Sequence, residues 1–201
     1  MVRILKCFGV VLAMACAPWV AAQGHVTPPD VMVRAGVNDV LAEIKKNRDP
    51  RALQAFAEAK LLSQFDFAAM TRLATGRAWS KASAAQKQAL ENAFRTLLVR
   101  TYTIALAQMT GTYTVNVKPA VIRLGDPDTV VKTLIKGSSR PPLPIDFRVT
   151  RTPGGWKVYD VVVENLSLVT NYRSSFKSEI SRSGIDGLIK VIEDKNRKAE
   201  S

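Results

Sequence analysis

Residues 145–163 read IDFRVTRTPGGWKVYDVVV, and this stretch decides the fold. Apolar Ile145, Phe147 and Val149 alternate with polar neighbours, which is typical of a strand with one buried face. Pro153-Gly154-Gly155 is a tight turn signal, and a second apolar run follows it at 156–163. The stretch therefore predicts a β-hairpin within an antiparallel sheet.

Strand patterns continue upstream of this hairpin. Tyr113, Val115 and Val117 alternate with polar residues until Pro119 interrupts the run, and residues 129–136 form a further apolar run. A sheet of about four antiparallel strands is therefore expected between residues 112 and 164.

Helical patterns occupy both sides of the predicted sheet, over 27–110 and from 167 onward. The expected helix starts are Thr27 with Pro28 and Pro29 in the first turn, Asp49, Asp66, and a Ser83–Gln86 capping box before a long helix. Gly76, Gly111 and Gly184 are natural stops, the last between helices expected over 167–183 and 185–195. Helices flanking a run of strands indicate an α+β domain with helices packed on one sheet face.

The first 22 residues are typical of a cleaved secretory signal. Arg3 and Lys6 precede an apolar run over 10–20, and Val20-Ala21-Ala22 supplies small residues at a cleavage site. The alternatives are a membrane anchor and a lipidated N-terminus at Cys16. We therefore expect an exported protein with a signal peptide over 1–22, a single domain over 23–195 and a flexible tail over 196–201.

The chain offers little catalytic chemistry. Its two cysteines, Cys7 and Cys16, both lie in the predicted signal, so the mature chain has no thiol for a disulfide, a nucleophile or a metal ligand. His25 is the one histidine, which leaves no positioned imidazole for a catalytic triad or a metal site. There is no glycine-rich phosphate loop, so we expect neither cofactor nor metal.

One carboxylate keeps an enzymatic alternative open. Asp160 would be a candidate acid or base if it faced inward beside Tyr159 or Arg173, where burial would raise its pKa. The favoured interpretation is a strand carboxylate paired with a basic neighbour.

The charge balance is strongly basic. The chain has 29 Lys and Arg against 17 Asp and Glu, and only two of the basic residues lie in the predicted signal. An exported protein encounters anionic lipid surfaces rather than nucleic acid, and basic residues near such a surface contribute on the order of 1 kcal/mol each. The basic charge therefore favours transient contact with an anionic membrane, or it is simply a well-solvated surface.

An ordered set of residues resembles the MlaC family, also called the toluene-tolerance or Ttg2 auxiliary family of ABC transporters. The resemblance covers residues 31–195 and is carried by Phe65-Asp66-Phe67, Met70, Arg72, Gly76, Trp79, Gln86, Phe94, Leu97-Leu98, Tyr102, GWKVYDV at 155–161, Ser167-Leu168-Val169, Tyr172-Arg173, Phe176 and GIDGLI at 184–189. One departure is the turn after Glu164, where the family usually has a glycine and this chain has Asn165-Leu166.

The resemblance implies a periplasmic shuttle that moves phospholipid between an outer-membrane lipoprotein–porin complex and an inner-membrane ABC transporter with a lipid-binding ring. This activity maintains the lipid asymmetry of the outer membrane, and one branch of the family is associated with hopanoid export instead. The implied fold is α+β, with helices packed around one face of a strongly curved antiparallel sheet and a hydrophobic cavity between them. Phospholipid is then cargo rather than a cofactor.

The residues expected to line the cavity are the apolar positions of the long helix, the strands and the last helical region. They are Phe94, Leu97, Leu98, Thr101, Tyr102, Ala105, Val115, Val117, Phe147, Val149, Tyr159, Val161, Val163, Leu168, Tyr172 and Phe176. Arg148 and Arg173 are candidates for contact with the lipid head group. Each lining residue could instead belong to an ordinary packed core, which would suit an adaptor protein, and an enzyme using Asp160 is the other alternative.

Overall fold

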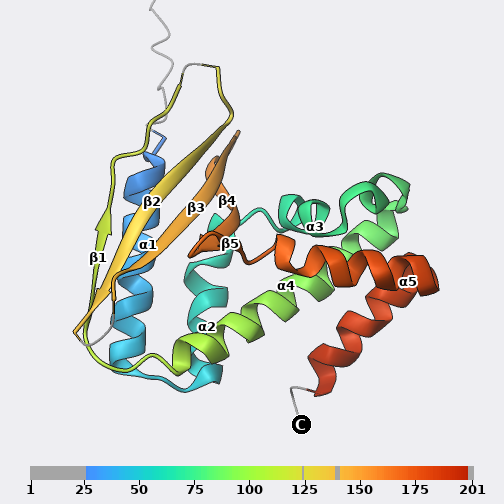
Figure 1. Ribbon diagram of the computed structural model, residues 1–201, viewed down its shortest axis with the longest axis horizontal. Coiled ribbons are helices and arrows are strands. Elements are labelled where there is room, and N and C mark those ends of the chain that lie inside the picture. Colours follow the sequence, from blue (N-terminus) through green and yellow to red (C-terminus); the bar gives the residue numbers. More distant parts are fainter. Residues whose placement is uncertain (1–25, 124, 139–140, 199–201) are drawn as a thin grey trace, which may run out of the picture.

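The computed structural model describes residues 26–123, 125–138 and 141–198, so the predicted signal peptide lies outside the described residues. Figure 1 shows an α+β fold, as expected from the sequence. The α-helices are α1 (Pro29–Lys46), α2 (Pro50–Lys60), α3 (Phe67–Thr75), α4 (Ala84–Ala107) and α5 (Arg173–Lys198), with short 3-10 helices η1 (Leu62–Gln64), η2 (Gly76–Lys81) and η3 (Thr170–Tyr172). Over these residues, no helix combines the length and the hydropathy needed to cross a bilayer.

The sheet is antiparallel throughout, and its five strands lie in chain order. The strands are β1 (Tyr113–Val117), β2 (Asp128–Gly137), β3 (Leu143–Thr152), β4 (Gly155–Val163) and β5 (Leu166–Ser167). The predicted hairpin is β3–β4. The fifth strand was not expected, because two residues are too few to show a period in the sequence.

The β4–β5 turn explains the departure from the family pattern. Val163 pairs with Leu166, which leaves Glu164 and Asn165 as a two-residue loop. Both have positive φ, 49° and 68°, as a tight hairpin turn of this length requires. Asn tolerates this backbone conformation better than most residues, so the turn forms without the usual glycine.

The predicted helix caps are confirmed. Asp49 accepts a hydrogen bond from the Ala52 amide at 3.1 Å, Asp66 accepts one from the Ala69 amide at 2.8 Å, and Ser83 with Gln86 forms a reciprocal capping box. These contacts satisfy amides at helix N-termini that have no intrahelical partner.

Some helix ends differ from prediction. The first helix begins at Pro29 rather than Thr27, and the long helix ends at Ala107, before Gly111. The helix expected from Ser167 begins only at Arg173, because Ser167 belongs to β5 and η3 intervenes. Gly184, with φ 72° and ψ −174°, interrupts α5 and separates two helical segments as expected.

The predicted flexible tail is corrected at its start. Helix α5 continues to Lys198, and Asn196 is buried, with its Nδ2 donating to the Ala93 carbonyl at 2.9 Å. Arg100 also donates to the Asn196 carbonyl at 2.5 Å. These contacts anchor the end of α5 to α4, and residues 199–201 lie outside the described residues.

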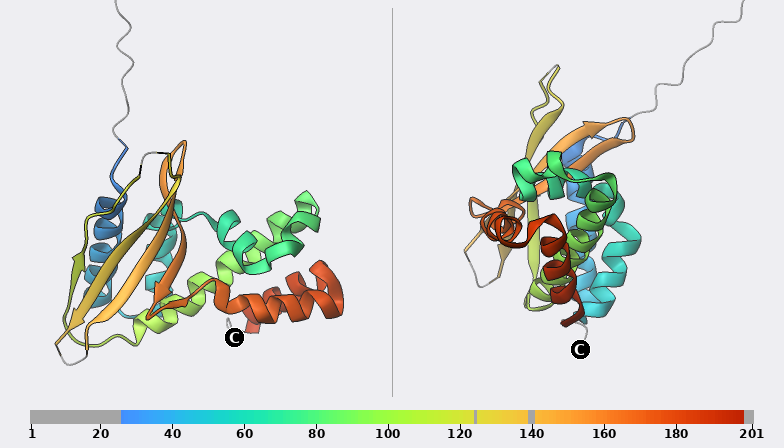
Figure 2. Two further views of the ribbon diagram at one scale, coloured as in Figure 1. Left: turned by 45° about the horizontal axis from the view of Figure 1, so that its top comes forward. Right: turned by 90° about the vertical axis from the view of Figure 1, so that its right-hand side faces the viewer.

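The molecule has a sheet half and a helical half. Helices α1, α2 and α4 lie on the same side of the sheet, while α3, α5 and the start of α4 extend away from it (Figures 1 and 2). Each half has its own core. The helical core contains Met70, Ala74, Leu90, Ala93, Phe94, Leu98, Val169, Phe176, Leu188 and Ile192, and the sheet core contains Val33, Val117, Val131, Val149, Trp156 and Val158. Phe65 packs against both cores and joins them.

Candidate functional site

The face of the sheet toward the helices is apolar. Strand register places Val117, Thr133, Ile145 and Val163 in one row across the sheet and Val131, Phe147 and Val161 in the next. Helix α1 is joined to this face at β1, where Arg34 donates to the Val117 carbonyl at 2.7 Å.

Burial on this inner face is incomplete. Val131 and Val149 are fully buried, whereas Val115, Phe147 and Val161 are only half-buried although they pack against the sheet core. Apolar side chains that face covering helices yet keep contact with solvent offer contact area to an apolar ligand, because burying it would release water from them.

The helical core differs because its aromatic residues pack against each other. The ring of Phe94 meets the rings of Tyr172 and Phe176 edge-on, each at 5.2 Å between centroids. Phe94 has no exposed surface. Such edge-to-face packing is typical of a filled interior.

The structure therefore divides the predicted lining residues between the two halves. Val115, Val117, Phe147, Val149 and Val161 belong to the sheet core or pack on it, and Phe94, Leu97, Leu98, Tyr102, Tyr172 and Phe176 belong to the helical core or pack on it. Val163 and Leu168 are half-buried, and Thr101 and Ala105 are exposed on α4. Contact of any of these residues with lipid stays a prediction.

A buried polar cluster around Asp160 lies where the two halves meet. Asp160 has no exposed surface, and its carboxylate pairs with Arg148 Nη1 at 3.2 Å. It also accepts hydrogen bonds from Ser167 Oγ at 2.9 Å and from the Val169 amide at 3.4 Å. Asp160 thus fastens β3 and the segment leading to α5 onto β4, and its oxygens are engaged within the protein. This arrangement matches the favoured interpretation of a paired strand carboxylate.

Tyr102 extends the same junction from α4. Its hydroxyl donates to the Leu168 carbonyl at 3.2 Å. Burial, followed by the nearby Tyr172 and Asp160, raises the pKa of Tyr102 well above its usual value. The phenol therefore stays protonated and keeps donating at all ordinary pH values.

The two head-group candidates lie in different surroundings. Arg148 is held by Asp160, with 42% of its side chain exposed. Arg173, the first residue of α5, is exposed and lines a groove with Arg72, Arg77 and Arg151. Sequence reasoning did not find this groove, because its arginines come from four separate elements.

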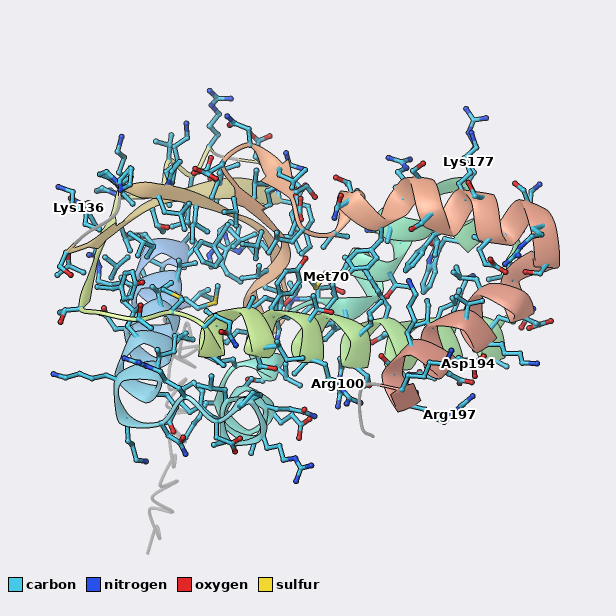
Figure 3. The ribbon with its side chains drawn as sticks, turned by 60° about the horizontal axis from the view of Figure 1, so that its bottom comes forward. Met70, Arg100, Lys136, Lys177, Asp194 and Arg197 are labelled. Carbon is cyan, nitrogen blue, oxygen red and sulfur yellow. The ribbon has the colours of Figure 1, made fainter. Side chains whose placement is uncertain are left out.

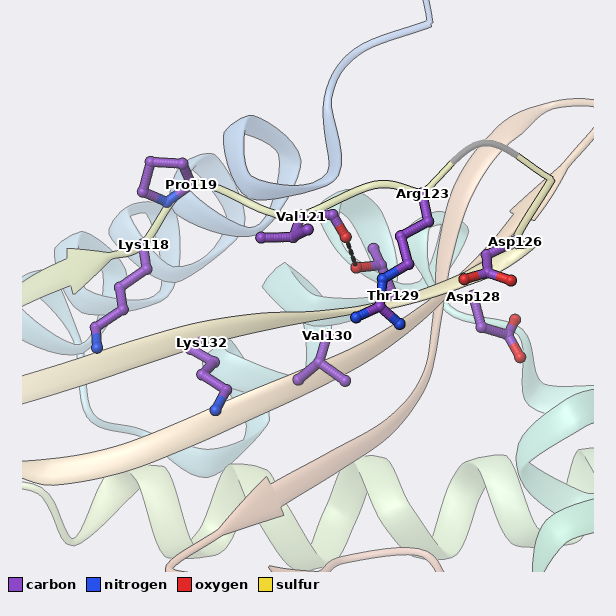
Figure 4. Close-up of a pocket in the computed structure, with 9 residues that line it drawn as sticks. All are labelled: Lys118, Pro119, Val121, Arg123, Asp126, Asp128, Thr129, Val130 and Lys132. Atoms are coloured by element: carbon purple, nitrogen blue, oxygen red, sulfur yellow. Dashed lines mark hydrogen bonds between the residues drawn. The ribbon is translucent and has the colours of Figure 1, made fainter.

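A second groove, of about 410 Å³, lies between β2 and the connection that follows β1 (Figure 4). Lys118, Arg123 and Lys132 line it together with Val121, whose carbonyl accepts a hydrogen bond from Thr129 Oγ1 at 2.8 Å. Val121 is 73% exposed and the adjacent Ile122 is 48% exposed. Sequence reasoning missed this combination of basic and exposed apolar residues, because the segment has no strand or helix period.

Comparison with known proteins agrees with this fold. The family model described as MlaC protein matches residues 34–194. The chain belongs to the MlaC family. It is also similar to a solved structure, the phospholipid-binding protein from Ralstonia solanacearum in complex with a phospholipid. The two are 33% identical, with a TM-score of 0.77, and the match covers 87% of this chain and 99% of the other.

The buried cluster around Asp160 is built from the segments whose sequence resembles the MlaC family. Asp160, Ser167 and Val169 all lie in segments that carried the resemblance, and they are joined by the hydrogen bonds described above. Ser167 Oγ additionally accepts a hydrogen bond from the Thr170 amide at 2.9 Å. These MlaC-like segments therefore build the junction between the sheet half and the helical half.

Proposed function

We propose that this protein is a periplasmic carrier of phospholipid, without enzymatic activity of its own. The observation that carries this proposal is the match to a phospholipid-binding protein whose structure contains a phospholipid, at 33% identity and a TM-score of 0.77. The half-buried apolar side chains of the inner sheet face support it, because acyl chains are the ligand that such a surface favours.

A carrier of this kind works by burial alone. Two acyl chains contain roughly 30 methylenes, so exposing them to water costs on the order of 20 kcal/mol at about 0.8 kcal/mol each. An apolar interior removes most of this cost, and exchange with a membrane then becomes nearly neutral. No reactive group is needed.

The pathway is part of the proposal. The family resemblance favours movement of lipid between an outer-membrane lipoprotein–porin complex and an inner-membrane ABC transporter complex, in support of outer-membrane lipid asymmetry. The predicted signal peptide supports export to the periplasm. A hopanoid or another lipid is the alternative cargo, and it would use the same apolar surface.

Transient membrane contact fits the groove between β2 and the β1–β2 connection. Val121 and the adjacent Ile122 are exposed apolar residues. Val121 lines the groove together with Lys118, Arg123 and Lys132 and with the carboxylates of Asp126 and Asp128 (Figure 4). Apolar side chains that enter the interface, next to cations that attract anionic lipid, are the two elements of peripheral membrane binding.

Native mass spectrometry of the purified chain, followed by lipid extraction, tests the carrier proposal. We expect about one phospholipid per chain. Val161→Trp should reduce this occupancy because it fills space on the inner face, and Val162→Trp is the matched control because Val162 is the adjacent residue and points to the opposite face. A chain without lipid that takes none from vesicles would refute the carrier proposal, and equal occupancy in the two variants would refute the inner sheet face as the lipid site.

A further inference from the structure

Four arginines meet at one groove beside the sheet. The groove has a volume of about 690 Å³ and lies where the sheet meets α3 and the start of α5. Arg72 comes from α3, Arg77 from η2, Arg151 from β3 and Arg173 from α5. All four side chains belong to exposed residues.

None of these arginines has an ionic partner within the described residues. No carboxylate of residues 26–123, 125–138 or 141–198 lies within 4.0 Å of their side-chain nitrogens. Two carboxylates, Asp66 and Asp128, also line the groove, but Asp66 is occupied as the cap of α3, and neither forms an ion pair with one of the four arginines. Four arginines against two carboxylates leave the lining of the groove net positive, and a bound anion would lower the repulsion among the guanidinium groups.

Gly76 leaves room for one of the guanidinium groups. It has φ 58°, and a Cβ at this position would lie 3.1 Å from Nη2 of Arg173. The bare backbone of Gly76 therefore lets the Arg173 guanidinium lie close to the end of α3. A side chain here would be strained by the backbone angle and would displace the arginine.

Neutral donors complete the groove. Thr150 and Tyr159 line the sheet side. Burial, followed by the carboxylate of Asp128, raises the pKa of Tyr159, so its hydroxyl remains a donor. Thr150 alternates with the buried Val149 along β3, so it contributes to the groove from the sheet face opposite to the apolar inner face.

We propose that this groove binds a phosphate group, carried either by a lipid head group or by a soluble phosphate ester. The planar guanidinium group matches phosphate oxygens with two parallel hydrogen bonds, which makes arginine the preferred residue for such recognition. Binding of a lipid head group in this groove rests on the proposed carrier function, whereas binding of a soluble phosphate ester does not.

Titration calorimetry at low ionic strength tests the groove with two probes. Glycerol 3-phosphate is a phosphate monoester, and glycerophosphocholine is the diester of a lipid head group without its tails. The chain should bind at least one of them, and Arg72→Gln/Arg173→Gln should weaken that binding at least ~tenfold, because each lost charge-assisted hydrogen bond costs about that much. The control Lys177→Gln/Lys190→Gln removes two charges from exposed residues of α5 and should change the affinity less than about twofold (Figure 3 shows Lys177).

The outcomes separate the two sources. Preference for the diester, with less co-purified phospholipid in Arg72→Gln/Arg173→Gln, supports a lipid head group. Preference for the monoester, with unchanged lipid content, supports a soluble phosphate ester. If Arg72→Gln/Arg173→Gln is unfolded by circular dichroism, Arg77→Gln/Arg151→Gln replaces it.

The proposal is overturned if neither probe binds the unmodified chain, or if the groove variant binds as tightly as the α5 control. Failure of the carrier function gives a different result. In that case the purified chain contains no lipid and takes none from vesicles, while it still binds glycerol 3-phosphate through the groove.

Discussion

Replacing Asp160 by alanine should destabilise the protein strongly, even though the change removes only one small side chain. The carboxylate has no exposed surface and contacts Arg148 Nη1, Ser167 Oγ and the Val169 amide. Breaking a buried ion pair costs about 3–5 kcal/mol. The lower end applies here, because the Arg148 side chain is 42% exposed and can regain water when its partner is lost. We therefore expect Asp160→Ala to lower the free energy of unfolding by about 3 kcal/mol.

Replacing Arg148, the other member of the pair, should lower the free energy of unfolding at least as much. Arg148→Gln leaves the fully buried Asp160 carboxylate without its cation, and this charge cannot reach water. We expect the free energy of unfolding to fall by about 4–5 kcal/mol, near the upper end of the range for a broken buried pair. Asp160→Asn keeps an oxygen for Ser167 and Val169, so its cost should be the smallest of the three.

Equilibrium urea denaturation followed by far-ultraviolet circular dichroism measures these differences. All variants must be compared after delipidation, because a ligand that binds the folded state adds its own stabilisation. In a thermal scan, a loss of 3 kcal/mol corresponds to roughly 6–12 °C for a chain of this size. Asp194→Asn is the control, since it removes an exposed ion pair with Arg197 and should cost less than about 1 kcal/mol. A cost for Asp160→Ala no larger than that control would refute the reasoning.

Three further predictions concern stability. Phe94→Ala should cost about 3–5 kcal/mol in urea denaturation, because Phe94 is fully buried and its ring packs edge-on against two other aromatic rings; a cost below 1 kcal/mol would contradict a packed helical core. Gly184→Ala should cost about 1–3 kcal/mol from backbone strain alone, since φ is 72° and a Cβ would meet no atom within 4 Å; an unchanged urea midpoint would contradict this. The raised pKa of Tyr102 also predicts a pH dependence of the free energy of unfolding. The contribution of Tyr102 is fully present below pH 10 and is lost as the pH rises above 10, because the phenol then ionises in the unfolded chain but not yet in the folded one. Tyr102→Phe should show a smaller loss between pH 9 and pH 11, and an equal loss would refute this assignment.

Local features of this fold were accessible from the sequence. The caps Asp49, Asp66 and Ser83 accept hydrogen bonds from amides three residues away, so their chemistry is visible in a short window. The β3–β4 hairpin is also local, since its turn and both alternating runs lie within 145–163. Family resemblance then supplied the expected arrangement of helices and sheet.

The partner of Asp160 could not be derived from such windows. Counting back from the turn, where Thr152 pairs with Gly155, places Arg148 opposite Tyr159. A bulge adds one residue to β4 before this point, and Arg148 pairs with Asp160 instead. The composition of the strand does not show where the extra residue falls, so the ion pair appears only in the three-dimensional register.

The candidate site was hard to predict for a related reason. Apolar residues such as Phe94 and Phe147 have the same character in the sequence, yet Phe94 lies in a packed helical core while Phe147 is half-buried on the sheet. Packing density depends on neighbours from distant elements rather than on residue type. The arginine groove shows the same limit, because its members are spread over about a hundred residues of sequence.

The division into two cores bears on how the proposed carrier would stay folded as it binds and releases lipid. In the helical core, Phe94 has no exposed surface and its ring packs edge-on against Tyr172 and Phe176, so this part of the interior is closed by its own side chains. The sheet half keeps apolar surface such as Phe147 and Val161 incompletely buried, and the junction around Asp160 joins the two halves. Lipid binding should therefore change the free energy of the sheet half most, and hydrogen exchange measured with and without lipid should slow in β3 and β4 while the amides of α4 near Phe94 change little.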